Sequence, residues 1–344
     1  MNTDFDNLNA DYLFPKLHLM WAQSVHGERL AALVNSGSSD ALERVLVSMG
    51  VDCSDRREVQ RQLASAVFRK ILPLTAALPG GMLEYYRLFM ARHFLDNVKT
   101  VLRYRQGTEG LAPAELQALL LDVPGFPQVE ADVSGVLRLR EGGVLPESWR
   151  REFKEVSEAL LSTGDIFAAE NRLDLFYWRQ ILACLAGMPD ELGEAVRSFV
   201  GQEADIRNVM MTLRSLKLYR MPADVIRRSL LPGGRYLKSD GLDRIASAIS
   251  EEDLLSKLPA PLAGVVREAL PRGLPEVEDA LWEYLWGRAC RMFRDYSQPE
   301  LSVAVFPFMK WIEMQNLYRL HEGLYIGLPV EELRLLVIGE SCGD

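Results

Sequence analysis

Apolar residues recur at helical spacing along residues 199–235, FVGQEADIRNVMMTLRSLKLYRMPADVIRRSLLPGGR. One stripe of a first predicted helix consists of Phe199, Ile206, Val209, Met210 and Leu213. Pro222 interrupts this stripe and is typical of a first helical position, and Asp224 is placed to face the positive end of a new helix. The glycines of the Pro-Gly-Gly at residues 232–234 end that helix. The stretch is therefore predicted to form a helix, an elbow and a second helix.

This pattern occurs three times along the chain. The copies align on Asn97, Asn208 and Asn316, which are spaced by 111 and 108 residues, and Val or Leu follows each asparagine. A proline that opens the second helix follows 16, 14 and 13 residues later, at Pro113, Pro222 and Pro329. Three matches at near-equal spacing indicate an internal repeat of about 110 residues, which is longer than the repeat unit of common helical solenoids.

The rest of the chain also has helical periodicity. Further helices are predicted over residues 8–47 with a break at 37–40, and over 56–72, 83–105, 107–121, 147–161, 165–186, 242–249, 251–258, 265–270 and 277–296. Pro299 and Pro307 are predicted to bracket the approach to the last asparagine-bearing helix. Because strand signals are nearly absent, the fold is predicted to be all-α. Its three helical repeats are predicted to span residues 1–125, 126–238 and 239–344.

Acidic residues precede the asparagines of the second and third copies. Glu203, Asp205 and Asn208 form an E-x-D-x-x-N pattern, and Glu313 stands three residues before Asn316. A Leu-Pro-Gly-Gly follows the second copy, residues 327–333 read GLPVEEL, and the chain opens with DFDNLNA at residues 4–10. This set of motifs resembles the C-subunit of the prokaryotic V-type (A/V-type) rotary ATPase, the counterpart of the d-subunit of the vacuolar proton pump. The resemblance covers almost the whole chain.

The resemblance implies three similar helical subdomains of about 110 residues in a pseudo-threefold, funnel-like arrangement. It also implies a non-catalytic central-stalk protein that links the rotor shaft to the proteolipid ring of the membrane. Such a protein couples ATP hydrolysis or synthesis to proton or sodium transport, with ring and shaft as its partners. The first copy departs from the family pattern, because Arg92 and His93 stand where the paired acids are expected, with Asp96 nearby. A helical-repeat interaction scaffold unrelated to ATPases is the alternative.

Composition limits the partners that this chain can bind directly. The 344 residues carry a formal net charge of −9, which argues against nucleic acid and against direct binding to anionic lipid. No apolar run reaches the length of a membrane span, and the acidic N-terminus does not resemble a signal peptide. The four cysteines lack C-x-x-C spacing and are expected to be reduced. We therefore expect a cytoplasmic protein, peripheral on the cytoplasmic face of the membrane through the ATPase complex.

The search for reactive chemistry predicts no catalytic, cofactor-binding or metal-binding residues and no cofactor. A phosphate-binding P-loop requires Gly-Lys, which does not occur in the sequence. The Gly-x-Ser-x-Gly at residues 339–343 lacks the following helix and histidine of a nucleophile elbow, so this match is interpreted as accidental. The four histidines, His18, His26, His93 and His321, are too dispersed to form a ligand cluster.

Two features have both a structural and a functional interpretation. The asparagines Asn97, Asn208 and Asn316 could contact a partner, but a structural role is favoured, in which each amide bonds a neighbouring backbone group. The aromatic helix at residues 277–296 could likewise be a partner-binding face. For that helix a place in the core is favoured, because large apolar side chains dominate protein interiors.

Overall fold

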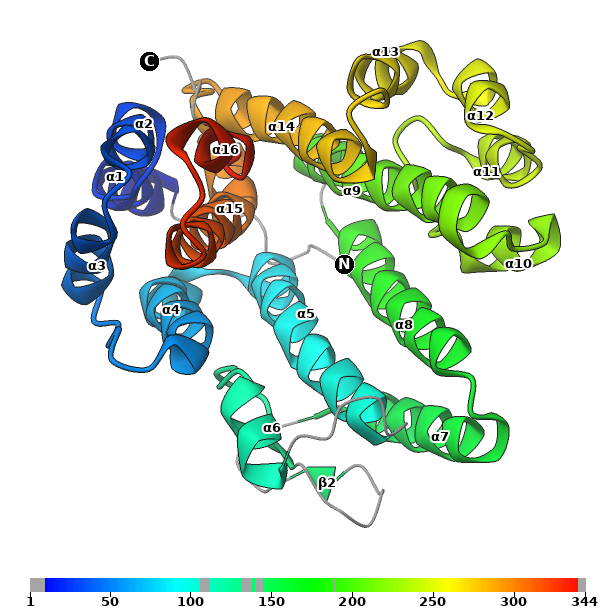
Figure 1. Ribbon diagram of the computed structural model, residues 1–344, viewed down its shortest axis with the longest axis horizontal. Helices are drawn as coiled ribbons and strands as arrows, with labels where there is room; N and C mark the ends of the chain where they lie inside the picture. Colours follow the sequence, from blue (N-terminus) through cyan, green and yellow to red (C-terminus); the bar gives the residue numbers. More distant parts are fainter. Residues whose placement is uncertain (1–9, 106–111, 131–137, 140–144, 189, 340–344) are drawn as a thin grey trace. The chain divides into compact units, whose positions relative to one another are not determined.

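The computed structural model describes residues 10–105, 112–130, 138–139, 145–188 and 190–339, and these are largely helical (Figure 1). The strands among them are β1 (Val129–Glu130) and β2 (Arg138–Leu139), which form a two-residue antiparallel ladder with Val129 opposite Leu139. The prediction of an all-α fold is confirmed, because this short ladder is the single departure from helix and loop within the described residues.

The chain divides into two compact units. Residues 39–184 form the middle unit, whereas the described residues 10–38 and 185–339 form the terminal unit. Helices of the middle unit are α3 (Ser39–Ser48), α4 (Arg56–Ile71), the 3-10 helix η2 (Leu72–Ala77), α5 (Gly80–Arg105), α6 (Pro113–Leu119), α7 (Glu147–Thr163) and α8 (Ile166–Ala186), whose last two residues belong to the terminal unit. The predicted division into three repeats at residues 125 and 238 stays a prediction.

Both chain ends contribute helices to the terminal unit. These helices are α1 (Ala10–Ala22), α2 (Gly27–Ser36), α9 (Asp190–Arg214), the π-helical turn η3 (Ser215–Tyr219), α10 (Ala223–Ser229), α11 (Ser239–Ala246), α12 (Glu251–Lys257), α13 (Ala260–Ala269), α14 (Leu274–Phe293), α15 (Pro299–Tyr325) and α16 (Val330–Leu335). Helix α14 packs against α9, α13 and α15, and α1 packs along α15. The N-terminal segment is therefore part of the same core as the last third of the chain.

Local sequence explains many of the helix boundaries. The Asp55 side chain accepts a hydrogen bond from the Arg57 amide at 2.9 Å and caps α4. Ser250 caps α12 in the same way, through the Asp253 amide at 3.1 Å. The elbow after α9 lies where Met221 and Pro222 predicted it, and Arg220 there adopts a left-handed φ of 50°.

Several predicted boundaries are displaced, since α11 and α14 each begin three residues before their predicted starts and α13 begins five residues before. Two further differences change how the chain divides into helices. Residues 8–47 contain a further break at residues 23–26, between α1 and α2, and Gly27 at the start of α2 has a φ of +50°. Pro307 does not precede the last asparagine-bearing helix but lies inside α15. Residues 301–310 are all buried, so packing on both sides of Pro307 holds the helix together through a residue that lacks an amide hydrogen.

Aromatic side chains fill the core of the terminal unit between α9, α14 and α15. The ring of Phe308 meets Phe199 edge-on at a centroid distance of 5.3 Å and lies 6.3 Å from Trp282. Trp286 and Phe293 of the aromatic helix are also buried, each with 2% exposure. The interpretation of this helix as core is confirmed for these residues. Burial of such rings is a large part of the hydrophobic stabilisation of the unit.

The first testable prediction concerns this core. Replacement of Phe308 by alanine should lower the free energy of unfolding by about 3–5 kcal/mol, because it leaves a cavity between three helices. Ile249→Ala is the matched control, since Ile249 is 87% exposed and should lose less than about 0.5 kcal/mol. Urea titration followed by far-ultraviolet dichroism measures both values. Equal stability of the two variants would contradict this description of the core.

Candidate functional site

Each of the three long helices α5, α9 and α15 carries an asparagine that bonds both backbone groups of one distant residue. Asn208 Nδ2 donates to the Leu231 carbonyl oxygen at 2.8 Å, and the Leu231 amide donates to Asn208 Oδ1 at 2.7 Å. Asn97 holds Leu121 through the same two bonds at 2.7 and 2.8 Å. Asn316 holds Ile338 at 2.6 and 2.9 Å. We call each of these bond pairs an asparagine clamp.

The clamp fixes the short helix after each elbow against its long helix. A side-chain amide has one carbonyl acceptor and an NH₂ donor, so it can pair with the N–H and C=O of a single residue. Leu121, Leu231 and Ile338 each lie two or three residues past the end of a short helix, respectively α6, α10 and α16. The three asparagines are at most 4% exposed. The predicted structural bonding of these amides to neighbouring backbone groups is confirmed.

The position three residues before each asparagine holds a second segment, by a carboxylate in the second and third copies and by an aromatic ring in the first. In the second copy the Asp205 carboxylate accepts hydrogen bonds from the Tyr236 and Leu237 amides at 2.8 and 3.1 Å. In the first copy that position is Phe94, which stacks on Phe126 at a centroid distance of 5.2 Å. Tyr236 and Phe126 each lie five residues after the residue that their clamp holds. In the first copy, an aromatic contact therefore takes the place of the hydrogen bonds that the acid accepts in the second copy.

In the third copy the equivalent acid holds the N-terminal segment. Glu313 Oε1 accepts a hydrogen bond from the Val25 amide at 2.8 Å. Lys310 forms an ion pair with Glu313 and donates to Ser24 Oγ at 2.9 Å. Lys310 and Glu313 are at most 2% exposed, and a buried ion pair offsets its desolvation cost only when its remaining polar atoms are also bonded. Ser24 and Val25 supply those bonds between α1 and α2.

The Leu-Pro-Gly-Gly motif lies against α9 at very short distance. A Cβ atom on Gly201 would come within 2.7 Å of the Gly233 carbonyl oxygen and 2.8 Å of the Arg235 amide nitrogen. A Cβ atom on Gly234 would overlap the Asp205 carboxylate. Glycine at both positions therefore permits the loop to approach α9 closely enough for Asp205 to bond it. Close packing thus accounts for Gly234, which was interpreted from the sequence as a helix cap.

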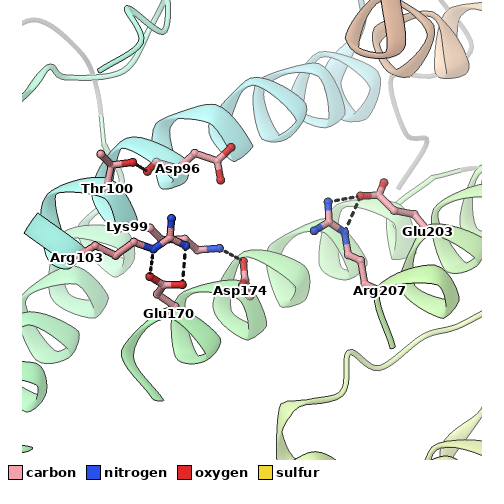
Figure 2. Close-up of polar contacts among 8 residues, drawn as sticks. All are labelled: Asp96, Lys99, Thr100, Arg103, Glu170, Asp174, Glu203 and Arg207. Atoms are coloured by element: carbon pink, nitrogen blue, oxygen red, sulfur yellow. Dashed lines mark hydrogen bonds and ion pairs between the residues drawn. The ribbon is translucent and has the colours of Figure 1, made fainter. Parts of the chain in front are cut away.

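Burial raises the pKa of the Asp205 carboxyl to about 6, although its backbone hydrogen bonds act in the opposite direction. Two residues earlier, Glu203 Oε1 accepts two bonds from the Arg207 guanidinium, at 2.9 and 3.0 Å (Figure 2). Arg207 also lies over the Trp282 ring, 5.9 Å from its centroid. The two acids of the E-x-D-x-x-N motif therefore have different roles, since Asp205 holds a loop and Glu203 holds a cation.

Ion pairs join α5 and α8 in the middle unit. Lys99 Nζ lies 2.5 Å from Asp174 Oδ1, and the Arg103 guanidinium bonds both oxygens of Glu170, at 2.5 and 2.8 Å (Figure 2). Arg103 and Asp174 are substantially exposed, so each pair contributes about 1 kcal/mol or less. These charges fix the relative position of the two helices within the unit more than they add stability.

The histidines are dispersed and engaged in packing. His18 stacks on Phe293 with the ring centroids 4.3 Å apart, and His26 stacks on Trp21 at 4.0 Å. Burial, with a further contribution from the neighbouring Arg92, lowers the pKa of His93 to about 3. No three potential metal ligands cluster anywhere in the described ranges. The residues that follow Gly339 in the Gly-x-Ser-x-Gly match lie outside the described part of the chain.

Two of the four cysteines, Cys53 and Cys184, have free thiols. Cys290 is disulfide-bonded, so the expectation of reduced cysteines is wrong for this residue. Spacing along a sequence does not reveal which cysteines lie close together in space, which explains the error. Across the described residues, no helix has both the length and the apolar character that crossing a membrane requires.

Sequence reasoning missed the partners of the buried acids. The E-x-D-x-x-N motif signals that two acids sit on a helix, but not that Asp205 meets the loop after Leu231 or that Glu313 meets Val25. The Gly-Gly after the second copy is the signal that could have indicated a close backbone approach.

These features define an α-helical protein organised by repeated helix–elbow–helix segments, each closed by an asparagine clamp. The chain belongs to the ATP synthase (C/AC39) subunit family, whose model matches residues 25–336. The resemblance to the C-subunit of A/V-type ATPases is thereby confirmed over most of the chain.

Two relatives show the same similarity over long alignments. The chain is 23% identical to the A-type ATP synthase C-subunit of Thermococcus gammatolerans, over 96% of this chain and 90% of that protein. It is 22% identical to the A-type ATP synthase C-subunit of Methanosphaera stadtmanae, over 76% of this chain and 70% of that protein.

The second testable prediction concerns the clamp. Asn208→Ala should lower the free energy of unfolding by at least about 2 kcal/mol, because the Leu231 N–H and C=O would each stay buried without a partner. Asn35→Ala is the control, because Asn35 is exposed and bonds the exposed Arg334 side chain. Thermal melts of both variants test the difference. A loss no greater than that of the control would refute the clamp.

The third prediction concerns pH. The folded-state pKa of Asp205, about 6, lies above its value of about 3.9 in an unfolded chain, so the folded protein binds this proton more tightly. The contribution of the Asp205 carboxyl to the free energy of unfolding is therefore greatest below about pH 4, and it falls by about 3 kcal/mol as the pH rises through 6. The difference in unfolding free energy between Asp205→Asn and the wild type should therefore shift by that amount in favour of the variant as the pH rises from 4 to 7. Asp240→Asn, which removes an exposed carboxylate, is the control for the loss of one negative charge.

Proposed function

We propose that this chain is a non-catalytic central-stalk subunit of an A/V-type rotary ATPase. In this role it links the rotor shaft to the ion-carrying ring of the membrane and couples ATP hydrolysis or synthesis to proton or sodium transport. The observation that carries the proposal is the family match over residues 25–336. Two relatives with long alignments are named as the C-subunit of A-type ATP synthases, which supports the same assignment.

Several features of the chain support a mechanical role over a catalytic one. Passing torque requires a body whose helices do not shift relative to one another within each unit. The asparagine clamps and the buried Lys310–Glu313 pair tie helices together by directional bonds in the interior. Among the described residues, we find no convergent nucleophile, base and oxyanion site.

The recurrence of the clamp on α5, α9 and α15 supports the finer proposal of three similar subdomains in a pseudo-threefold funnel. The alternative of an unrelated helical-repeat scaffold is disfavoured by the family match. Repeats near 110 residues are also much longer than those of linear solenoids. The proposed partners are the proteolipid ring and the shaft subunits.

The proposed location is the cytoplasmic face of the membrane, reached through the ATPase complex. A formal net charge of −9 disfavours direct contact with anionic headgroups. Binding through the ring and shaft needs no lipid contact of its own.

The fourth prediction tests this function directly. Deletion of this chain from its host complex should leave ATP hydrolysis by the soluble head in place while abolishing ATP-driven ion uptake into membrane vesicles, because the shaft would no longer turn the ring. Adding back purified wild-type chain should restore the uptake. The control is addition of heat-unfolded chain. Ion uptake that persists without the chain would refute the proposal.

A further inference from the structure

Two half-buried arginines of the terminal unit meet at one serine. Arg235, in the loop after α10, donates from Nη1 to Ser198 Oγ at 2.8 Å. Arg288 of α14 donates from Nη2 to the same oxygen at 3.0 Å, and from Nη1 to the Ser198 carbonyl oxygen at 2.8 Å. Arg291, one turn further along α14, is exposed. We call Arg235, Arg288 and Arg291 the arginine cluster.

Within the described residues, no carboxylate lies at ion-pair distance from any guanidinium of the arginine cluster. This arrangement contrasts with neighbouring arginines, because Arg214 pairs with Glu278 and Arg319 pairs with Asp279. Burial, together with the positive charge of Arg235, lowers the pKa of Arg288 to about 10. The cluster is therefore an uncompensated concentration of positive charge on a protein whose net charge is −9.

The loop that carries Arg235 is held in one position. Asp205 bonds the next two backbone amides, and the Gly201–Gly234 approach leaves no room for the loop to shift inward. The Arg235 guanidinium lies 5.1 Å from the centroid of the Tyr236 ring. The Tyr236 hydroxyl in turn lies 3.1 Å from the Tyr284 hydroxyl on α14. The donors are thus fixed before any ligand arrives, which reduces the entropy lost on binding.

A guanidinium has five N–H donors in a planar fork that matches the two oxygens of a carboxylate or phosphate. Ser198 and Gln202 engage some of the N–H groups of Arg288, and Ser198 engages one of Arg235. The phenols of Tyr236 and Tyr284 add neutral hydroxyl groups next to these charges. The guanidinium groups of the cluster therefore have the donor chemistry that suits the oxygens of an anionic ligand.

We propose that the arginine cluster is a docking site for an acidic side chain of a protein partner, whose carboxylate pairs with these guanidinium groups. A carboxylate is favoured over a phosphate because the backbone amides of Tyr236 and Leu237, which follow Arg235, already donate to Asp205 and so do not cradle a phosphate. The chain's negative charge also opposes approach to an anionic lipid surface. The identity of the partner as a protein of the ring or the shaft rests on the proposed function.

The test measures binding of the full-length chain to purified rotor ring in neutral-lipid vesicles and, separately, to purified shaft subunits. Arg291→Glu is the main variant, because Arg291 is exposed and its replacement should leave folding intact. We expect it to weaken binding to one of the two partners about tenfold or more at low salt, with a smaller loss at high salt. Arg288→Gln should have the same effect, and its thermal melt is measured alongside. Arg267→Glu, an equal charge change at an exposed position of α13, should bind like the wild type.

The outcomes separate this inference from the proposed function. Wild-type chain that binds neither ring nor shaft overturns the proposed function. If the wild type binds, and Arg291→Glu and Arg288→Gln both bind with the same affinity, the carboxylate site is overturned and the stalk role stays in place. A third arm uses anionic vesicles without rings and inorganic phosphate as probes. Binding of the wild type to either probe that is lost in Arg291→Glu would reassign the cluster to phosphate and overturn the proposal.

Discussion

A buried side-chain amide that pairs with one backbone residue is the interaction on which the repeated segments of this protein depend. An unpaired peptide group in the interior costs about 1–3 kcal/mol, so the residue after each short helix needs a partner for both its N–H and its C=O. Asparagine provides both from a single position on a long helix. Elbows of different length are compatible with this scheme, because the clamp fixes where the short helix ends and not where it begins.

The residue three positions before each clamp asparagine differs among the three copies. Asp205, Glu313 and Phe94 occupy the same place relative to the clamp, yet they hold a loop, the N-terminal segment and an aromatic ring. Different residue types are tolerated at this position for a geometric reason. Any side chain that projects from that face of the helix can hold a neighbouring segment if its chemistry suits the group it meets. In the second copy this contact also positions Arg235 beside α14.

Much of the fold could be predicted from the sequence, because it depends on periodicity and local chemistry. The repeat, the elbows and the structural bonding of the asparagines belong to this class. The rest depends on contacts between distant residues. The sequence places Pro307 before the last asparagine-bearing helix, but burial on both sides of this proline keeps it inside α15. The arginine cluster joins residues 235, 288 and 291, which form no motif along the chain, and only the folded loop brings Arg235 to α14.

The bond between Glu313 and the Val25 amide has a consequence for how the protein is made. It joins residues separated by 288 positions, so the terminal unit cannot complete its interior until the ribosome has released the segment that carries Glu313. Residues 39–184 of the middle unit, in contrast, emerge from the ribosome as one uninterrupted stretch. During synthesis, the apolar faces of α1 and α2 therefore stay uncovered while the whole middle unit is translated. Until then the early chain exposes apolar helix faces, which makes it prone to aggregation during synthesis.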